Sequence, residues 1–347
     1  MMAAKGKYIY GIVPNFYGTE MFGSLENSGV YAIPYQNISA IVSDRASAQL
    51  DYSDRESLGY LLINHQRTIE YLMGKGFTMI MPMRLGTIAR TKDEVFKILS
   101  NGYDLIVEAL SKIEHLTEYD IAVTWADFSA ALVEIAEHPD IIALKAEMQS
   151  KADTHLKIDQ VKVGMMVQSK LKERNSKVEL TILEALSSIS IDIKTHEVMN
   201  DEMITNSAFL INRNKKELFE EAIDKLDEKY NGLLNFKLVG PLPCYSFFTL
   251  EVKDLNADRI VQSGQDLGLS EETTESEIKR AYLEKARLYH PDNTEDNGDP
   301  VRFNLIQNSY LNLVDYSLAV KQSSKDEQIS LRMEKVVENL ILVKIKE

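Results

Sequence analysis

The sequence is poor in cysteine and has no long apolar run. Cys244 is the only cysteine among 347 residues, so no internal disulfide can form, and no Cys/His cluster with zinc spacing accompanies it. No stretch approaches the roughly 18 uninterrupted apolar residues that a membrane-spanning helix requires. The N-terminal residues MMAAKGKYIYGIVP also lack the apolar core of a signal peptide. Together these absences predict a cytoplasmic protein in a reducing compartment.

Basic residues are fewer than acidic ones. Lys and Arg number 39 against 53 Asp and Glu, which gives a formal net charge of -14. This charge repels the phosphates of nucleic acids and the head groups of anionic lipids, so we expect neither a nucleic-acid partner nor a membrane partner. The expected partner is another protein.

Familiar catalytic motifs are missing as well. The sequence contains no GxGxxG, Walker, GxSxG or HExxH pattern, and Cys244 has no sequence neighbour that would activate it. We therefore expect no enzymatic activity, no cofactor and no metal site. A cleft with perturbed carboxylates would reopen the possibility of a small-ligand site.

What is present is a globular composition, 44% hydrophobic and 27% charged, in a chain long enough for two or three domains. The first predicted domain is residues 1–117. β-branched and aromatic residues predict its strands, and apolar residues at helical spacing predict a helix over 54–73. Thr91 and Glu94 have the spacing of a capping box at the start of another helix. The predicted strands are 8–13, 29–35, 38–44 and 78–82.

The second predicted domain is residues 118–256. Strand patterns and helix patterns alternate in the order strand, helix, strand, strand, helix, strand, which is the split βαβ order of a ferredoxin-like sheet. Residues 245–252 are a candidate for one further strand. The fold class expected for both domains is α+β. The elements run in order as a strand at 119–125, helices over 131–187 interrupted at Pro139, strands at 191–199 and 205–211, a helix at 215–230 and a strand at 236–240.

Three motifs in these two domains resemble the gas vesicle F/L family. They are YIYGIV at Tyr8 to Val13, HQRTIEYLMGKGFTMIMPMRLGTI at His65 to Ile88, and GPLPCYSF at Gly240 to Phe247. The resemblance implies a non-enzymatic protein that accompanies the small, very hydrophobic shell protein of gas vesicles. Without the resemblance, the residue types and their positions favour structural roles for Arg84 at a strand end and for His65 on the apolar face of its helix. The resemblance places the protein at the gas vesicle and in the cytoplasm.

Residues 257–320 resemble a DnaJ-type J-domain. Thr274 and Glu277 form a capping-box pattern, and Ile278, Tyr282, Ala286 and Tyr289 recur at helical spacing. His290, Pro291 and Asp292 follow at the predicted helix end, because the residue before a proline is excluded from helical geometry. A second stripe then faces the first across an antiparallel helix pair; it consists of Phe303, Ile306, Tyr310 and Leu313. His138, Pro139 and Asp140 repeat the triplet without this surrounding pattern and are interpreted as a helix junction.

The resemblance to J-domains implies that this segment engages a DnaK-type ATPase chaperone. The residues that take this role by resemblance are His290, Pro291, Asp292, Lys279, Arg280, Lys285 and Arg287. The alternative is a J-like helical hairpin that serves only as a structural or shell-contact module.

Residues 321–347 are expected to form a polar stretch and a C-terminal amphipathic helix. Ile329, Met333, Val336, Leu340 and Val343 would share one face of that helix. This face either docks on the sheet domains or contacts another vesicle protein. The sequence thus predicts an accessory or minor structural protein that binds the shell subunit and recruits a DnaK-type chaperone. The alternative is a general J-domain co-chaperone whose α+β domains select clients.

Overall fold

The computed structural model describes residues 5–17, 29–46, 55–149, 156–292, 298–324 and 328–346. Contacts divide the chain into two compact units. The first unit joins Met1–Lys112 to Phe248–Glu347, and the second unit is Ile113–Phe247. The segments that the sequence separates as 257–320 and 321–347 therefore lie in the same unit as the N-terminal residues.

The first unit contains an antiparallel sheet with the strand order β2-β3-β1-β4, and β5 also pairs with β1. Only Met81–Pro82 of the strand expected at 78–82 pairs with β1. The α+β class expected here is confirmed. The elements are β1 (Lys5–Pro14), η1 (Asn15–Tyr17), β2 (Val30–Tyr35), β3 (Ile38–Ala46), α2 (Arg55–Gly74), β4 (Met81–Pro82), β5 (Ile88–Ala89), α3 (Lys92–Asn101) and α4 (Tyr103–Ile113).

The second unit contains a four-stranded antiparallel sheet with the order β7-β8-β6-β9. This is the arrangement that a split βαβ order produces, so the ferredoxin-like prediction is confirmed. Alternate residues Tyr119, Ile121, Val123 and Trp125 of β6 are buried in one apolar core. The unit consists of β6 (Leu116–Trp125), α5 (Phe128–Ala136), α6 (Pro139–Gln149), α7 (Leu156–Ser187), β7 (Ser190–Thr195), β8 (Met203–Asn212), η4 (Arg213–Lys215), α8 (Lys216–Tyr230) and β9 (Leu234–Leu242).

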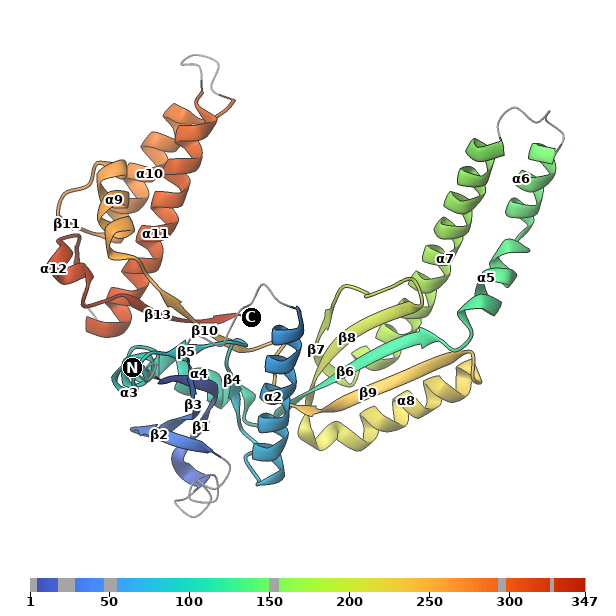
Figure 1. Cartoon of the computed structure of the whole chain (residues 1–347), viewed down its shortest axis with the longest axis horizontal. Coiled ribbons are helices and arrows are strands. Elements are labelled where there is room, and N and C mark those ends of the chain that lie inside the picture. Colours follow the sequence, from blue (N-terminus) through green and yellow to red (C-terminus); the bar gives the residue numbers. More distant parts are fainter. Residues whose placement is uncertain are drawn as a thin grey trace. The chain divides into compact units, whose positions relative to one another are not determined.

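Helices α5, α6 and α7 form an arm that extends beyond this sheet (Figure 1). A small apolar cluster of Ile135, Ile141 and Leu171 holds α5 and α6 against α7. Pro139 begins α6, where its missing N–H costs no helical hydrogen bond. The interruption predicted at Pro139 is thus the junction between α5 and α6.

The J-like segment folds as three helices, α9 (Ala257–Leu267), α10 (Glu275–Tyr289) and α11 (Pro300–Ser324), with the short strand β11 (Glu272–Thr273) before α10. The capping box at Thr274 and Glu277 is present in full. Helices α10 and α11 run side by side (Figure 1), and the Tyr282 and Tyr310 rings stack at 4.2 Å. The two predicted apolar stripes therefore face each other.

The C-terminal amphipathic helix predicted from the sequence is wrong. In its place lie β12 (Ile329–Ser330), the four-residue helix α12 (Met333–Val336) and β13 (Ile341–Lys346). β13 pairs with β10 (Thr249–Asp254), so the further strand expected at 245–252 is present but belongs to a separate two-stranded sheet. The ILVKIK sequence of β13 is rich in β-branched residues, which favour a strand. The spacing of its apolar residues does not reveal that it pairs with β10.

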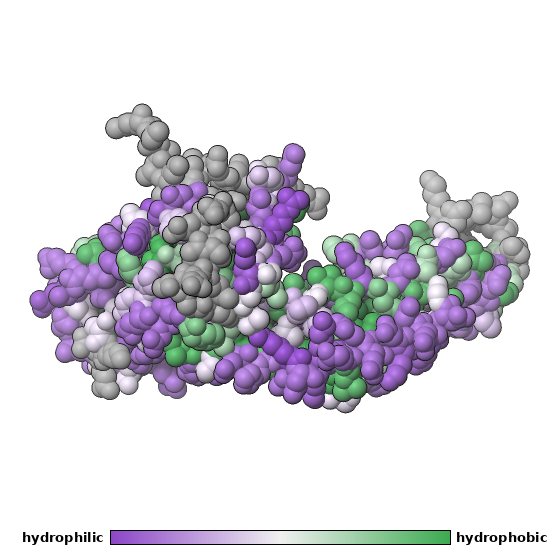
Figure 2. All heavy atoms as spheres, turned by 90° about the horizontal axis from the view of Figure 1, so that it is seen from below, coloured by the Kyte–Doolittle hydropathy of each residue, from purple (hydrophilic) through white to green (hydrophobic). Residues whose placement is uncertain are grey.

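Apolar side chains on the visible face of Figure 2 form separate patches among hydrophilic ones. Among the residues that the structure describes, every helix is either too short or too polar to span a bilayer. The described residues also contain no group of three or more His, Cys, Asp or Glu side chains arranged to hold a metal ion.

Candidate functional site

Helix α10 ends at Tyr289, with His290 as its C-cap, because a proline follows. His290 has φ -56° and ψ 133°, which is extended geometry, as the pre-proline restriction requires. The backbone N–H of Asp292 donates to His290 Nδ1 at 3.2 Å, so the neutral ring carries its proton on Nε2. The His290 ring packs edge-on against Phe303 of α11 at 5.3 Å. The triplet is therefore held by the ends of both helices.

The basic residues named from the sequence do not all lie on one face of α10. At 3.6 residues per turn, Lys279 and Arg280 lie on the same face as Arg287, and His290 follows that face into the loop. All three basic side chains are exposed. Lys285 lies on another face, where its ammonium nitrogen is 3.8 Å from the position that a Cβ on Gly268 would occupy. The structure thus groups three of the four basic residues with the triplet.

A shallow groove connects this basic face to the triplet. It has a volume of about 480 Å³. Its polar lining is Arg287, His290 and Asp292, and its apolar lining is Tyr282, Leu283, Ala286 and Phe303. Leu283 is 43% exposed, and the Asp292 side chain is 90% exposed. A protein surface that offers both an apolar side chain and carboxylates would complement such a groove.

Gly298 is a loop residue that sequence reasoning missed. A Cβ at this position would lie 2.0 Å from the His290 carbonyl oxygen and 3.1 Å from Pro291 Cα. No side chain fits so close to the backbone, so Gly298 allows the chain returning from the loop to pass against the triplet. The glycine shortly before Pro300 in the sequence was the available signal, but its neighbour could not be identified without the fold.

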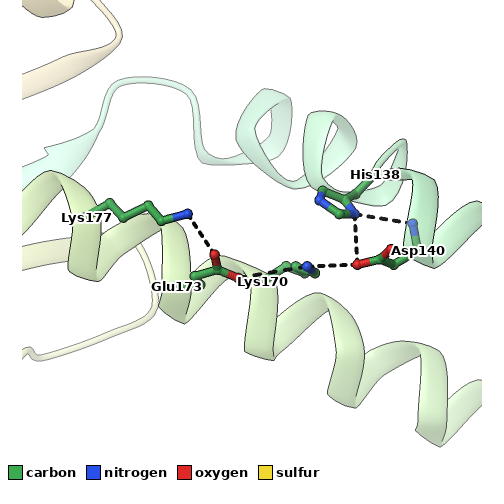
Figure 3. Close-up of polar contacts among 5 residues, drawn as sticks. All are labelled: His138, Asp140, Lys170, Glu173 and Lys177. Carbon is green, nitrogen blue, oxygen red and sulfur yellow. Dashed lines mark hydrogen bonds and ion pairs between the residues drawn. The ribbon is translucent and has the colours of Figure 1, made fainter.

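The second triplet has the same local geometry in a different setting. Asp140 N–H donates to His138 Nδ1 at 3.3 Å, as in the His290 triplet. Asp140, however, forms an ion pair with Lys170 of α7 at 2.9 Å, and Lys170 in turn contacts Glu173 (Figure 3). This pair lowers the pKa of Asp140. The junction interpretation of this copy agrees with these contacts, because the aspartate ties α6 to α7.

The GPLPCYSF motif contacts strand β6 in the sheet of the second unit. Gly240 has φ +155°, and a Cβ there would meet the Tyr119 ring at 2.5 Å, so only glycine fits. Further along, Ser246 donates twice to Glu118 of β6, from its backbone N–H and from its hydroxyl, both at 2.8 Å. Lys194 donates to the Ser246 carbonyl at 3.0 Å, and His196 Nε2 lies 3.2 Å from the Ser246 hydroxyl. The motif is anchored through one serine.

Glu118 and Asp120 form a buried carboxylate pair beneath this anchor. Glu118 is 1% exposed, and burial raises the pKa of its carboxyl group to about 8, with the neighbouring Asp120 adding to the rise. Burial also raises the pKa of Asp120. The nearby Cys244 thiol is buried, which raises its pKa to about 12 and keeps it protonated. The groove beside His290 contains neither of these carboxylates.

The fold and the loop define the class: an α+β protein of two compact units with a J-domain-like helical segment in the first. The chain belongs to the gas vesicle synthesis protein GvpL/GvpF family, whose sequence model matches residues 6–249. The DnaJ domain model matches residues 265–321. The resemblances stated from sequence are thereby confirmed for both parts of the chain.

Curated relatives carry the name gas vesicle protein F. The protein from Nostoc sp. (strain PCC 7120) is 23% identical over 247 residues, which span 70% of this chain and 98% of that protein. The protein from Dolichospermum flosaquae is 26% identical over 70% of this chain and 98% of its own length. The protein from Haloferax mediterranei is 19% identical over 71% of this chain and 94% of its own length.

Two solved structures share the fold. The crystal structure of the gas vesicle protein GvpF from Anabaena sp. PCC7120 matches with a TM-score of 0.58 at 21% identity, over 70% of this chain and 97% of that one. The corresponding protein from Microcystis aeruginosa matches with a TM-score of 0.55, also at 21% identity, over 70% of this chain and 98% of that one. Nearly the whole of each relative is thus matched by about 70% of this chain.

Proposed function

We propose that this chain is an accessory or minor structural protein of gas vesicle assembly that binds the hydrophobic shell subunit and recruits a DnaK-type chaperone. The observation that carries the proposal is the presence in one chain of the gas vesicle family match over 6–249 and the DnaJ-domain match over 265–321. A very hydrophobic subunit aggregates unless it is held, which gives a chaperone a reason to be present. The protein would act in the cytoplasm and at the gas vesicle.

The chaperone half of the proposal depends on the face of α10. Lys279, Arg280 and Arg287 present positive charge on the face that leads to the His290 triplet, in a chain whose total net charge is -14. Local positive charge steers an acidic protein surface toward the loop, and the apolar groove then supplies contact area. Pro291 fixes the extended geometry of His290, and Asp292 lies at the exposed rim. Lys285, which lies on the face of α10 beside the end of α9, would contact the chaperone from that side.

The shell half of the proposal depends on apolar side chains of α2. Leu58, Tyr60, Leu62 and Ile63 are 40%, 68%, 55% and 51% exposed, respectively. Several large apolar residues exposed on two turns of one helix supply the kind of surface that a hydrophobic subunit binds. We take this part of α2 as the candidate contact surface for the shell subunit.

The chaperone half is tested by ATPase stimulation with a control that the chain itself provides. His290→Gln is expected to abolish stimulation of a DnaK-type ATPase by the full-length protein. His138→Gln changes the same residue in the same triplet geometry and is expected to leave stimulation unchanged. Equal effects of the two substitutions, or no stimulation by the unaltered chain, would contradict the proposal.

The shell half is tested by co-purification with the shell subunit. The double variant Leu62→Ser and Ile63→Ser is expected to lose capture of the subunit, whereas Leu180→Ser, which alters a side chain 56% exposed on α7, is expected to retain it. Failure of the unaltered protein to capture the subunit would refute the proposal. Stimulation of the ATPase on unrelated clients, without the shell subunit, would favour the alternative of a general co-chaperone.

A further inference from the structure

The J-like segment enters and leaves the first unit through paired strands. β10 precedes the segment and β13 follows it, and the two pair antiparallel over six residues, from Thr249↔Lys346 to Asp254↔Ile341. Leu255 N–H also donates to the Leu340 carbonyl at 2.8 Å, which extends the pairing to the base of the segment. This is the connectivity of an insertion between two neighbouring strands, and it differs from that of a domain on a single tether.

The strand pair is joined to the N-terminal part of the same unit. Arg84 N–H donates to the Leu250 carbonyl at 2.8 Å, and Met83 forms a parallel bridge with Leu250. On the β13 side, Asn101 Nδ2 donates to the Ile341 carbonyl at 3.1 Å. A Cβ on Gly102 would lie 2.8 Å from Val343 Cγ1, so α3 ends in direct contact with β13. Both β10 and β13 therefore contact the N-terminal part of the first unit directly.

Helix α11 is fixed to the strand pair along its C-terminal half, at Asp315 and Gln322. Asp315, 7% exposed, accepts hydrogen bonds from Lys253 of β10 at 2.5 Å and from Lys344 of β13. Gln322 and Val343 exchange two hydrogen bonds, at 2.7 and 3.1 Å. We refer to Lys253, Asp315 and Lys344 as the ionic clamp.

The other end of α11 holds the triplet loop. Phe303 in its first turn contacts His290, and the loop lies at the end of α11 away from the β10–β13 pair (Figure 1). The helix has 25 residues, which at 1.5 Å per residue is a rod of about 37 Å. One continuous helix thus connects the strands of the first unit to the loop.

We propose that the J-like segment is a rigid insert of the first unit, held by the β10–β13 pair and the ionic clamp, which sets where a recruited chaperone acts relative to the N-terminal sheet. The consequence for function depends on the proposed function above. A flexible tether would let the chaperone sample many positions, whereas a rigid rod restricts it to one region about 22 Å from the clamp, the length of α11 from Asp315 to Pro300. A client held on the first unit would then meet the chaperone in one orientation.

The rigidity is tested first, because that test does not require any partner. Spin labels on Lys97→Cys of α3 and Glu284→Cys of α10, with Cys244→Ser to remove the native thiol, report the distance by double electron–electron resonance. A single narrow distance distribution is expected. Asp315→Lys places three ammonium groups together and is expected to broaden the distribution several-fold. Adding Lys253→Asp and Lys344→Asp restores opposite charges and is expected to narrow it again.

A broad distribution in the otherwise unaltered protein would overturn the rigid insert, whatever its function. If Asp315→Lys does not fold, deletion of residues 341–347 removes β13 and provides a second way to free the segment, with the same expected broadening. A distribution that stays narrow in both variants would overturn the roles assigned to the clamp and to β13.

The functional consequence is tested with the same variants. Asp315→Lys leaves the α10 face and His290 in place, so it is expected to retain ATPase stimulation while lowering the yield of assembled gas vesicles, and the charge-restored variant is expected to recover that yield. Full assembly by the freed variant would refute the functional consequence. Absence of ATPase stimulation by the unaltered protein would instead refute the proposed function, while the spin-label result would stand.

Discussion

Replacing Glu118 by glutamine is expected to stabilise the second unit at neutral and alkaline pH. Burial raises the pKa of this carboxyl group from its ordinary 4.5 to about 8 in the folded chain. The stability tied to its protonated form is fully present below the ordinary value and is lost as the pH rises through about 8. At about 1.4 kcal/mol per pKa unit, the free energy of unfolding should fall by about 3 kcal/mol between about pH 5 and pH 8.

Glutamine keeps the contacts of the protonated carboxyl group without the titration. Its carbonyl can accept from the Ser246 N–H, and its amide can donate to the Ser246 hydroxyl once that hydroxyl, which donates to Glu118, has turned. The groups that face Glu118 are Asp120 on the same strand, Lys194 and His196 at the end of β7, Cys244 in the covering motif, and Arg213 after β8. These groups remain in the variant, so a difference in pH dependence belongs to Glu118 together with Asp120, whose titration is coupled to it.

Trp125, the only tryptophan in the chain, lies in the apolar core of the second unit and reports its unfolding by fluorescence. Urea titrations at a series of pH values are expected to show a falling free energy of unfolding for the unaltered protein and a flatter profile for Glu118→Gln. Glu179→Gln serves as the control: it alters a carboxylate that is hydrogen-bonded to Thr205 in the same unit, and it should show the same pH profile as the unaltered protein. Parallel profiles for Glu118→Gln and the unaltered protein would show that Glu118 is already ionised at neutral pH and would refute the reasoning.

Three further predictions concern the J-like segment. Gly298→Ala is expected to lower ATPase stimulation several-fold, because its Cβ would clash with the His290 carbonyl, whereas Gly164→Ala, with no atom within 4 Å of the added Cβ, should not change stimulation. Arg287→Glu is expected to weaken chaperone binding more than Lys285→Glu, as measured by surface plasmon resonance at two salt concentrations, because only Arg287 lines the groove. Hydrogen bonds from Lys253 and Lys344 outweigh burial and lower the pKa of Asp315, so its contribution to stability is lost as the pH falls. Asp315→Asn should therefore cost about 1–2 kcal/mol at neutral pH and progressively less in acid, as followed by thermal unfolding.

The sequence predicted those elements whose pattern is local. Most strands of both sheets and the capping box at Thr274 were predicted because alternation and capping are patterns among neighbouring residues, whereas the two-residue strand β5 was missed. The C-terminal segment was predicted wrongly because Ile329, Val336 and Val343, all buried, also fit a helical spacing. Partner strands far earlier in the chain decide the conformation of two of them: Val343 pairs with Thr249–Asp254 and Ile329 pairs with Thr273. Pairing between distant segments leaves no trace in the periodicity of either one.

The candidate site, too, could be predicted only where its pattern is local in the sequence. The triplet and the basic residues of α10 were named from the sequence, and the helix geometry that groups Lys279, Arg280 and Arg287 follows from their spacing. The position of Lys285 beside Gly268 and the need for glycine at 298 depend on how α9, α10 and the returning loop pack. Neither could be obtained without the fold, because each is a contact between elements that no local pattern records.

The two His-Pro-Asp triplets show why a motif must be weighed with its surroundings. The backbone and the histidine ring adopt the same hydrogen bond at both sites, since the proline dictates the local geometry in each. The aspartate is what differs: Asp140 is tied to Lys170, whereas the Asp292 side chain is 90% exposed beside a groove. An aspartate already paired within its own chain must break that ion pair before it can bind a partner. The His138 triplet is therefore a junction between helices, whereas the His290 triplet keeps its aspartate exposed, as its predicted recognition role requires.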